Sequence, residues 1–271
     1  MSTNDKEVAK KKNNEVAAMA DYGEDAGSGF ETTDTSELSI PFLGILQSNS
    51  PQVEDEDPVG AKSGMFFNTV TRELISGTDG FVFLPVHKDR QYVEWVPREK
   101  GGGFVGMFAP DADEVKKAIS NNNNNRYGKL AVGDNDLIET YYVYGLLLSE
   151  DGSETVGFGV ISFTSTKIKP CRDWFTSMYT LKGRAPLFAN RARFTTAKQK
   201  NDKGTFYNFR IDPLGDSWAS SLINPTDQAE LLEEARDFRK MIMSGMATAN
   251  YDSEKSHEGN SNVDTETGEI F

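Results

Sequence analysis

Short runs of β-branched and aromatic residues, separated by polar turns, constrain this fold more than any other feature of the sequence. They cover residues 80–87, 91–96, 137–148, 155–163 and 205–211. Runs of this length and composition are typical of strands. The polar residues between the first two runs predict a hairpin turn, and Asp151-Gly152 predicts a second one after 137–148. The sequence therefore predicts a mainly β core of antiparallel hairpins.

Two helices are expected beside these strands. Residues 111–119 carry acidic side chains in the first turn of a short helical pattern. Residues 224–245 form the clearest helix, which Asn224 or Thr226 can cap and Gly245 can end. Its apolar stripe consists of Leu231, Leu232, Ala235, Phe238, Met241 and Ile242.

Composition divides the 271 residues into an ordered centre and two polar ends. Residues 1–37 are polar with almost no large apolar residue, and residues 246–271 show no periodicity, which predicts a disordered arm and a disordered acidic tail. Between them we expect a β-rich core over 38–222 and the C-terminal helix over 223–245. Antiparallel hairpins favour a small β-barrel, and the OB-fold is the commonest such scaffold for single strands. A β-sandwich remains the alternative.

The charge is distributed unevenly along the chain. The net charge is -13, yet residues 163–210 hold 11 Lys or Arg and only 2 Asp or Glu. Cations that follow phosphates, interleaved with rings on which bases stack, are typical of a groove for single-stranded nucleic acid. Alternatively, the cations form an ordinary solvated face, and about half of the aromatic residues belong to the core. The candidate nucleic-acid contacts in this segment are Lys167, Lys169, Arg172, Trp174, Phe175, Tyr179, Lys182, Arg184, Arg191, Arg193, Lys198, Lys200, Tyr207 and Arg210.

A second basic and aromatic stretch lies upstream, between residues 90 and 104. Strand alternation places Tyr92 and Trp95 on opposite faces, so only one of them can face a groove. The candidate contacts here are Arg90, Tyr92, Trp95, Arg98, Lys100 and Phe104.

No motif predicts catalysis or a cofactor. The chain has no phosphate loop, dinucleotide fingerprint or nucleophile elbow. Cys171 is the single cysteine and the two histidines, His87 and His257, are far apart, which excludes an internal disulfide and a Cys/His zinc site. Glu94, Glu99 and Lys100 imitate part of a metal-nuclease site, but such proximity arises by chance in an acidic chain. We therefore expect a protein without enzymatic activity, metal or cofactor.

The chain has no signal peptide and no apolar run long enough to span a membrane, so a cytoplasmic protein without membrane contact is expected. Its last 22 residues hold 6 acidic residues and 1 lysine, and they end on an aromatic side chain. Such a tail can occupy the basic groove of its own protein and offer its terminal carboxylate to partners. The alternative is a tail that only promotes solubility. The candidate partner-binding residues of the tail are Asp264, Glu266, Glu269, Ile270 and Phe271.

The order of these parts resembles the single-stranded DNA-binding proteins of bacteria and their phages, in which an acidic tail ending in Phe follows a β-barrel. Gly268-Glu269-Ile270-Phe271 shares the Ile and Phe of that ending but lacks its Pro. Residues 38–107 are also similar to proteins of phage replication clusters, through SIPFLGILQSNSPQV, GAKSGMFFNTVTRELISG and YVEWVPREKGGGFVG. The resemblance implies a phage protein in the cytoplasm of an infected bacterium. It would bind single-stranded DNA with little sequence preference and contact replication or recombination proteins through its tail.

Two other hypotheses fit the same sequence. One is a strand-annealing recombination protein that forms rings or filaments on DNA. The other is a non-catalytic virion or host-interaction protein whose basic segment contacts an acidic protein.

Overall fold

The computed structural model describes residues 28–29, 39–97, 100–121, 130–181, 183, 185–201, 204–245 and 248–249. Packing divides the chain into two units, Met1–Glu37 and Leu38–Phe271. The first contains only a described turn at Ser28 and Gly29. The second contains every element discussed below. Of the predicted disordered arm and tail, the structure describes only Ser28, Gly29 and the two residues Thr248–Ala249, and the rest lies outside the described residues.

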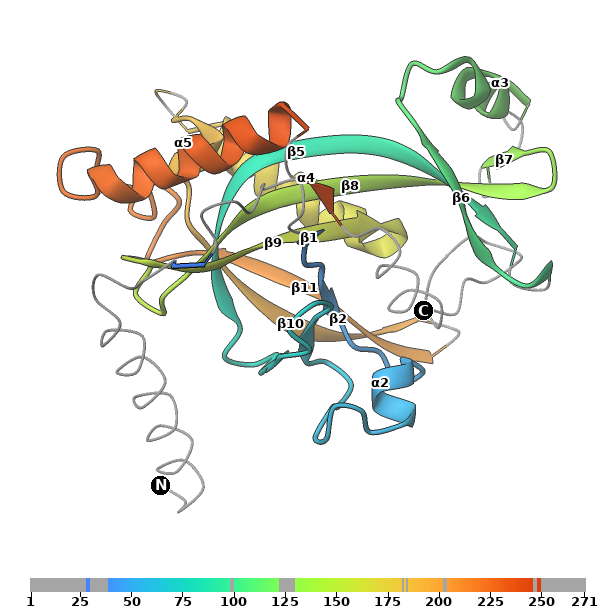
Figure 1. Ribbon diagram of the computed structural model, residues 1–271, viewed down its shortest axis with the longest axis horizontal. Helices are drawn as coiled ribbons and strands as arrows, with labels where there is room; N and C mark the ends of the chain where they lie inside the picture. The colour runs from blue at the N-terminus through green and yellow to red at the C-terminus, as the bar shows by residue number, and fades with distance from the viewer. Residues whose placement is uncertain are drawn as a thin grey trace. The chain divides into compact units, whose positions relative to one another are not determined.

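A seven-stranded antiparallel sheet forms the centre of the second unit (Figure 1). Its main path runs β11–β10–β5–β8–β7, while β6 pairs with β5 and β9 pairs with β8. The predicted mainly β, antiparallel core is confirmed, and the pairings among the described residues leave the sheet open and close no barrel. The strands are β5 (Phe81–Val96), β6 (Gly103–Phe108), β7 (Leu130–Val132), β8 (Asn135–Leu148), β9 (Thr155–Thr164), β10 (Ala192–Asn201) and β11 (Gly204–Pro213).

Strand β5 is continuous over sixteen residues, so the predicted hairpin turn between 80–87 and 91–96 is wrong. His87, Lys88, Asp89 and Arg90 pair in register with Tyr144 to Tyr141 of β8. The polar residues 87–91 are tolerated inside this strand because their side chains are only partly buried or exposed. The turn after β8 is confirmed, since β8 and β9 pair as antiparallel neighbours.

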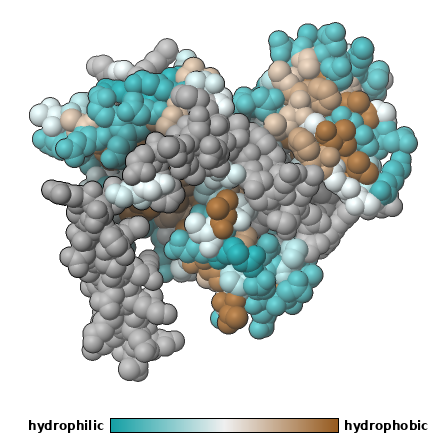
Figure 2. Space-filling model, in the orientation of Figure 1, coloured by the Kyte–Doolittle hydropathy of each residue, from teal (hydrophilic) through white to brown (hydrophobic). Residues whose placement is uncertain are grey.

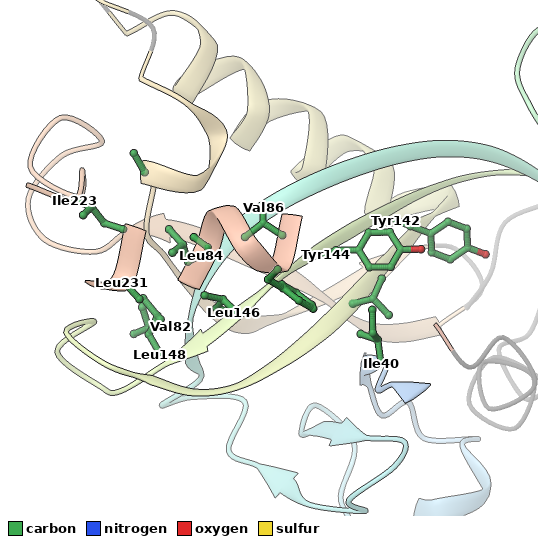
Figure 3. Close-up of a cluster of buried hydrophobic side chains, with 14 of the residues drawn as sticks. Ile40, Val82, Leu84, Val86, Tyr142, Tyr144, Leu146, Leu148, Ile223 and Leu231 are labelled. Carbon is green, nitrogen blue, oxygen red and sulfur yellow. The ribbon is translucent and has the colours of Figure 1, made fainter. Parts of the chain in front are cut away.

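One face of the sheet packs against the C-terminal helix α5 (Ala229–Met243) and the short helix η5 (Leu187–Ala189). Alternating residues of β5 and β8 point into this α5 core (Figure 3). They are Val82, Leu84, Val86, Tyr142, Tyr144, Leu146 and Leu148, and they meet Ile40, Ile223 and Leu231.

Helix α5 confirms the predicted C-terminal helix, although it begins at Ala229 and not near Asn224. Asn224 does not cap it, because its side-chain oxygen accepts the N–H of Thr226 in a turn before the helix. The outward face of α5 is hydrophilic (Figure 2) and carries the ion pairs Arg236–Glu233 and Lys240–Asp237.

The opposite face of the sheet packs against α4 (Ile168–Tyr179), a helix for which the sequence carried no clear signal. Cys171, Trp174 and Met178 of α4 are buried in this α4 core. The helix begins directly after the short helix η4 (Ser165–Lys167). The remaining buried members of the core are Leu43, Ile45, Phe66, Phe81, Phe83, Tyr141, Val143, Ile161, Phe163, Ala192, Phe194 and Phe209.

Smaller elements complete the unit. Helix α3 (Asp113–Asn121) confirms the predicted helix over 111–119 and packs with Tyr92 and Leu137 in a separate cluster. Strands β2 (Leu43–Ile45), β3 (Phe66–Asn68) and β4 (Leu74–Ile75) form a three-stranded sheet, and α2 (Pro51–Glu54) is a single turn. Strand β1 (Ser39–Ile40) pairs in parallel with β12 (Thr248–Ala249). Of the helices described, none is long and apolar enough to cross a membrane.

Candidate nucleic-acid interface

A β-bulge in β5 decides which face of the sheet carries its cations. Pro85 pairs with Gly145 and His87 pairs with the next residue, Tyr144, which leaves Val86 as an extra residue. Val86 points into the α5 core, and in a regular strand Lys88 would follow it there. The extra residue reverses the alternation. Lys88 and Arg90 therefore lie on the α4 face of the sheet.

The ammonium group of Lys88 lies between two aromatic rings. Its Nζ is 4.3 Å from the ring centroid of Tyr141 and 4.5 Å from that of Phe175. Both distances are within the range of cation–π attraction. Burial lowers the pKa of Lys88 below its ordinary value, and the positive charges of Arg172 and Arg90 lower it further.

Two arginines from different elements meet at one carboxylate. Arg90 Nε on β5 is 2.8 Å from Glu139 Oε1 on β8, and Arg172 Nη2 on α4 is 3.5 Å from the same oxygen. The Tyr141 hydroxyl donates to this oxygen at 3.0 Å and accepts a hydrogen bond from Arg172 at 3.2 Å. The guanidinium groups also lie 5.9 Å (Arg90) and 5.7 Å (Arg172) from the Tyr141 ring centroid.

These side chains form one group, which we call the Lys88 cluster. It carries three positive charges and one negative charge. Within the part of the chain that the structure describes, Glu139 is the one carboxylate in ion-pair contact with its cations. An excess of positive charge held on rigid elements is the electrostatic requirement for binding a polyanion. The members are Lys88, Arg90, Glu139, Tyr141, Arg172 and Phe175.

The outer surface of α4 extends the cluster along the protein. Arg172, Phe175 and Tyr179 are spaced by three and four residues, which places them along one stripe of the helix. Seven residues of α-helix span about 10 Å. Tyr179 is 66% exposed. The stripe therefore begins with the cation Arg172 and ends with an accessible aromatic ring.

The structure brings together only part of the predicted contacts. Arg90, Arg172 and Phe175 belong to the Lys88 cluster, and Tyr179 lies on the same stripe. Tyr92 is buried beside α3 and accepts a hydrogen bond from Arg90 Nη2 at 2.8 Å, so it supports the arginine and is not itself exposed. The other predicted residues lie elsewhere or serve other purposes.

Several predicted contacts are structural residues. Trp174 is 2% exposed and stacks edge-on against Phe194 in the α4 core. Arg191 donates to the main-chain carbonyls of Gly152, Ser221 and Leu222. Burial lowers its pKa. Arg193 donates to the carbonyls of Asp79 and Glu150. The side chains of Trp174 and Arg191 are thus engaged inside the fold, and direct nucleic-acid contact by these two residues stays a prediction.

Other predicted cations form exposed ion pairs with carboxylates that do not belong to the cluster. Lys100 pairs with Asp134 at 2.9 Å, and Arg210 pairs with Asp212 at 2.8 Å. Lys169 pairs with Asp173 on α4 at 2.7 Å. Lys167 lies in η4 at the start of that helix. Trp95 and Phe104 pack edge-to-face at 5.9 Å beside the α5 core, with both rings partly buried.

A second group of cations lies on the β10–β11 hairpin. Strand β10 pairs with β5 only through Ala192 to Phe194, so the rest of the hairpin continues past this edge. Lys198 and Lys200 are exposed there and form no ion pair within the described residues. Tyr207, opposite Lys198, exchanges two 2.9 Å hydrogen bonds between its main chain and the Gln47 amide.

Eight predicted site residues lie outside the described residues. They are Arg98, Lys182, Arg184, Asp264, Glu266, Glu269, Ile270 and Phe271.

Sequence reasoning missed three members of the cluster: Lys88, Glu139 and Tyr141. Lys88 was hidden in the polar stretch interpreted as a turn. Glu139 and Tyr141 share a face of β8, and a carboxylate inside a largely apolar strand is a signal for a cation on the neighbouring strand. No group of three or more His, Cys, Asp or Glu side chains suited to a metal ion occurs in the described ranges.

Comparison with known proteins gives one match. A family model described as Pam3 phage gp34-like protein matches residues 9–248. No curated protein and no solved structure matches the chain.

Proposed function

This chain belongs to the Pam3 phage gp34-like family, which is phage-derived, and from that membership we propose that it is a non-catalytic single-stranded DNA-binding protein. It would act in phage replication or recombination. The observation that carries the proposal is the Lys88 cluster, in which Arg90 of β5 and Arg172 of α4 share one carboxylate and the Lys88 ammonium lies between the rings of Tyr141 and Phe175.

In this proposal the cluster binds the sugar-phosphate backbone. Arg90 and Arg172 supply guanidinium groups that can hold phosphate oxygens through paired N–H donors. Lys88 adds a half-buried charge beside them. Phosphates carry no sequence information, so these contacts imply binding with little sequence preference.

Base stacking would fall to Tyr179 and not to the rings inside the cluster. Tyr141 and Phe175 already face the Lys88 ammonium, and Tyr141 is 6% exposed. Tyr179 presents an accessible ring at the end of the α4 stripe. A stacked base contributes roughly 1–3 kcal/mol in such sites. A duplex keeps its bases stacked on one another, so this ring favours single strands.

The test is a fluorescence titration with oligo-dT over a series of salt concentrations. We expect affinity to fall steeply as salt rises, because phosphate contacts release counterions. The triple variant K88M/R90Q/R172Q should bind weakly, and the slope of log K against log salt should fall by about 2, as expected for three lost contacts to a single strand.

A matched control removes three exposed cations from other elements: K116Q/R236Q/K240Q, on α3 and α5. It changes the net charge equally and should bind nearly as tightly as the natural protein. Thermal unfolding of each variant confirms folding. The proposal is wrong if the natural protein does not bind oligo-dT at low salt, or if the two triple variants lose affinity equally.

A further inference from the structure

We propose that Glu139 is an internal occupant of the phosphate position in the Lys88 cluster, and that DNA binds there by replacing its carboxylate. The inference rests on the proposed function and adds regulation to it. Glu139 holds the arginines when no DNA is bound and lowers the affinity of the site for phosphate.

The convergence of donors on one oxygen supports this role. Glu139 Oε1 accepts from Tyr141 and Arg90 and faces Arg172, so donors from β8, β5 and α4 are directed at a single anionic atom. Protein sites hold a phosphate oxygen with the same kind of charged donors. The carboxylate thus imitates the ligand that the site is built to bind.

The fit of the carboxylate is incomplete. Arg172 Nη2 lies 3.5 Å from Glu139, longer than the usual 2.9 Å of an N–H···O hydrogen bond. A phosphate offers several oxygens and can accept from both guanidinium groups at short range. A bound phosphate would therefore contact Arg172 at a shorter distance than the Glu139 carboxylate does.

Glu139 is also free to move aside. Its side chain is 23% exposed, and those of Arg90 and Arg172 are 43% and 57% exposed, so water reaches all three. Partly exposed ion pairs contribute little to folding. Exchange of the carboxylate for a phosphate then leaves the strand pairing of β5 and β8 intact, because that pairing uses main-chain atoms.

The experiment compares Glu139→Gln with Asp173→Asn in oligo-dT titrations. Asp173 is the matched control, since it pairs with Lys169 on α4 and its loss changes the net charge by the same amount. E139Q keeps the size of the side chain but removes the competing charge. We expect it to bind oligo-dT roughly fivefold to tenfold more tightly than the natural protein, and D173N to change affinity by less than about twofold.

The opposite role for Glu139 is that it positions the arginines for DNA. In that case E139Q would bind more weakly, and that result would overturn the inference, as would equal affinities of E139Q and D173N. Glu139→Ala, measured alongside, should also bind more tightly, which separates loss of charge from a new amide contact. If the natural protein binds but E139Q gains nothing, only this inference fails. If neither binds, the proposed function fails as well.

Discussion

At the scale of single residues, the fold divides similar side chains between core and surface. The aromatic residues of 163–210 look alike in sequence, yet Trp174 fills the α4 core and Tyr179, five residues later, is 66% exposed. The cations divide in the same way, since Arg172 lies in the Lys88 cluster while Arg191 is bound to three main-chain carbonyls. Charge and aromatic content thus identified the segment but not the contacts within it.

Substitution of Trp174 tests its structural role. Trp174→Ala should lower the free energy of unfolding by about 3–5 kcal/mol, because it leaves a large cavity in the core. Trp174→Phe should cost less, since the indole N–H has no hydrogen-bond partner among the described residues. Urea denaturation measures the free energy of unfolding of both variants. Oligo-dT affinity of W174F should equal that of the natural protein, and a large loss of affinity without loss of stability would contradict the assignment.

The thiol of Cys171 should be inert in the folded protein. Burial raises its pKa to about 12 from an ordinary value of 9.0, against the opposing effect of Lys88 and Arg172. At pH 8 the thiolate fraction is then roughly a thousandfold lower than in the unfolded chain. A disulfide reagent should therefore label the native protein slowly and the denatured protein at once.

The same shift predicts how stability depends on pH. In the unfolded chain the Cys171 thiol ionises near pH 9, whereas in the folded protein it ionises near pH 12. The contribution of the neutral thiol is therefore fully present below pH 9 and is lost as the pH rises toward 12. Cys171→Ala should flatten this part of the stability curve, and an unchanged curve would contradict the prediction.

At the scale of elements, the bulge in β5 and the helix α4 determine the candidate site. The periodicity of apolar residues in the sequence predicts neither of them. The bulge places one extra residue in a strand whose polar centre resembles a turn. The apolar residues of α4 are buried against strands that are distant in the sequence. The short apolar pattern of this helix therefore does not predict it without those strands. The strands with long apolar runs and the strongly amphipathic helix α5 were predictable, because their patterns are local.

The α4 stripe predicts a specific role for Tyr179. Tyr179→Ala should weaken oligo-dT binding by 1–3 kcal/mol, about 5- to 150-fold, without lowering the melting temperature. Tyr179→Phe keeps the ring and should retain most of the affinity. Met243→Ala on α5 is the control, because that side chain is also exposed, at 58%, and lies on the helix that packs against the other face of the sheet. Equal affinities of Y179A and M243A would exclude stacking at this position.

At the scale of the whole molecule, a net charge of -13 conceals a local positive surface. The basic segment is visible in the sequence, but the sequence alone cannot join Lys88 of one strand to Glu139 of another and Arg172 of a helix. That juxtaposition depends on pairings between residues about 50 and 30 positions apart along the chain. The mainly β architecture could be predicted from local patterns, whereas the site could not.

The distribution of charge also predicts the effect of shortening the chain. Removal of residues 250–271 takes away 6 acidic residues and 1 lysine. Because this weakens repulsion of a polyanion, oligo-dT affinity at low salt should stay equal or rise severalfold. Titration of the shortened protein and of the full chain with oligo-dT measures this difference in affinity. Weaker binding after truncation would show that these residues assist DNA binding.

The bulge at Val86 places two successive side chains, those of Val86 and His87, on the α5 side of β5. Loss of the Val86 codon would therefore leave a regular strand in which the pairs Pro85–Gly145 and His87–Tyr144 follow one another directly. Lys88 and Arg90 would stay on the α4 face. Within this family, an in-frame deletion at this codon would remove a side chain from the α5 core and keep the cations of the cluster where they are.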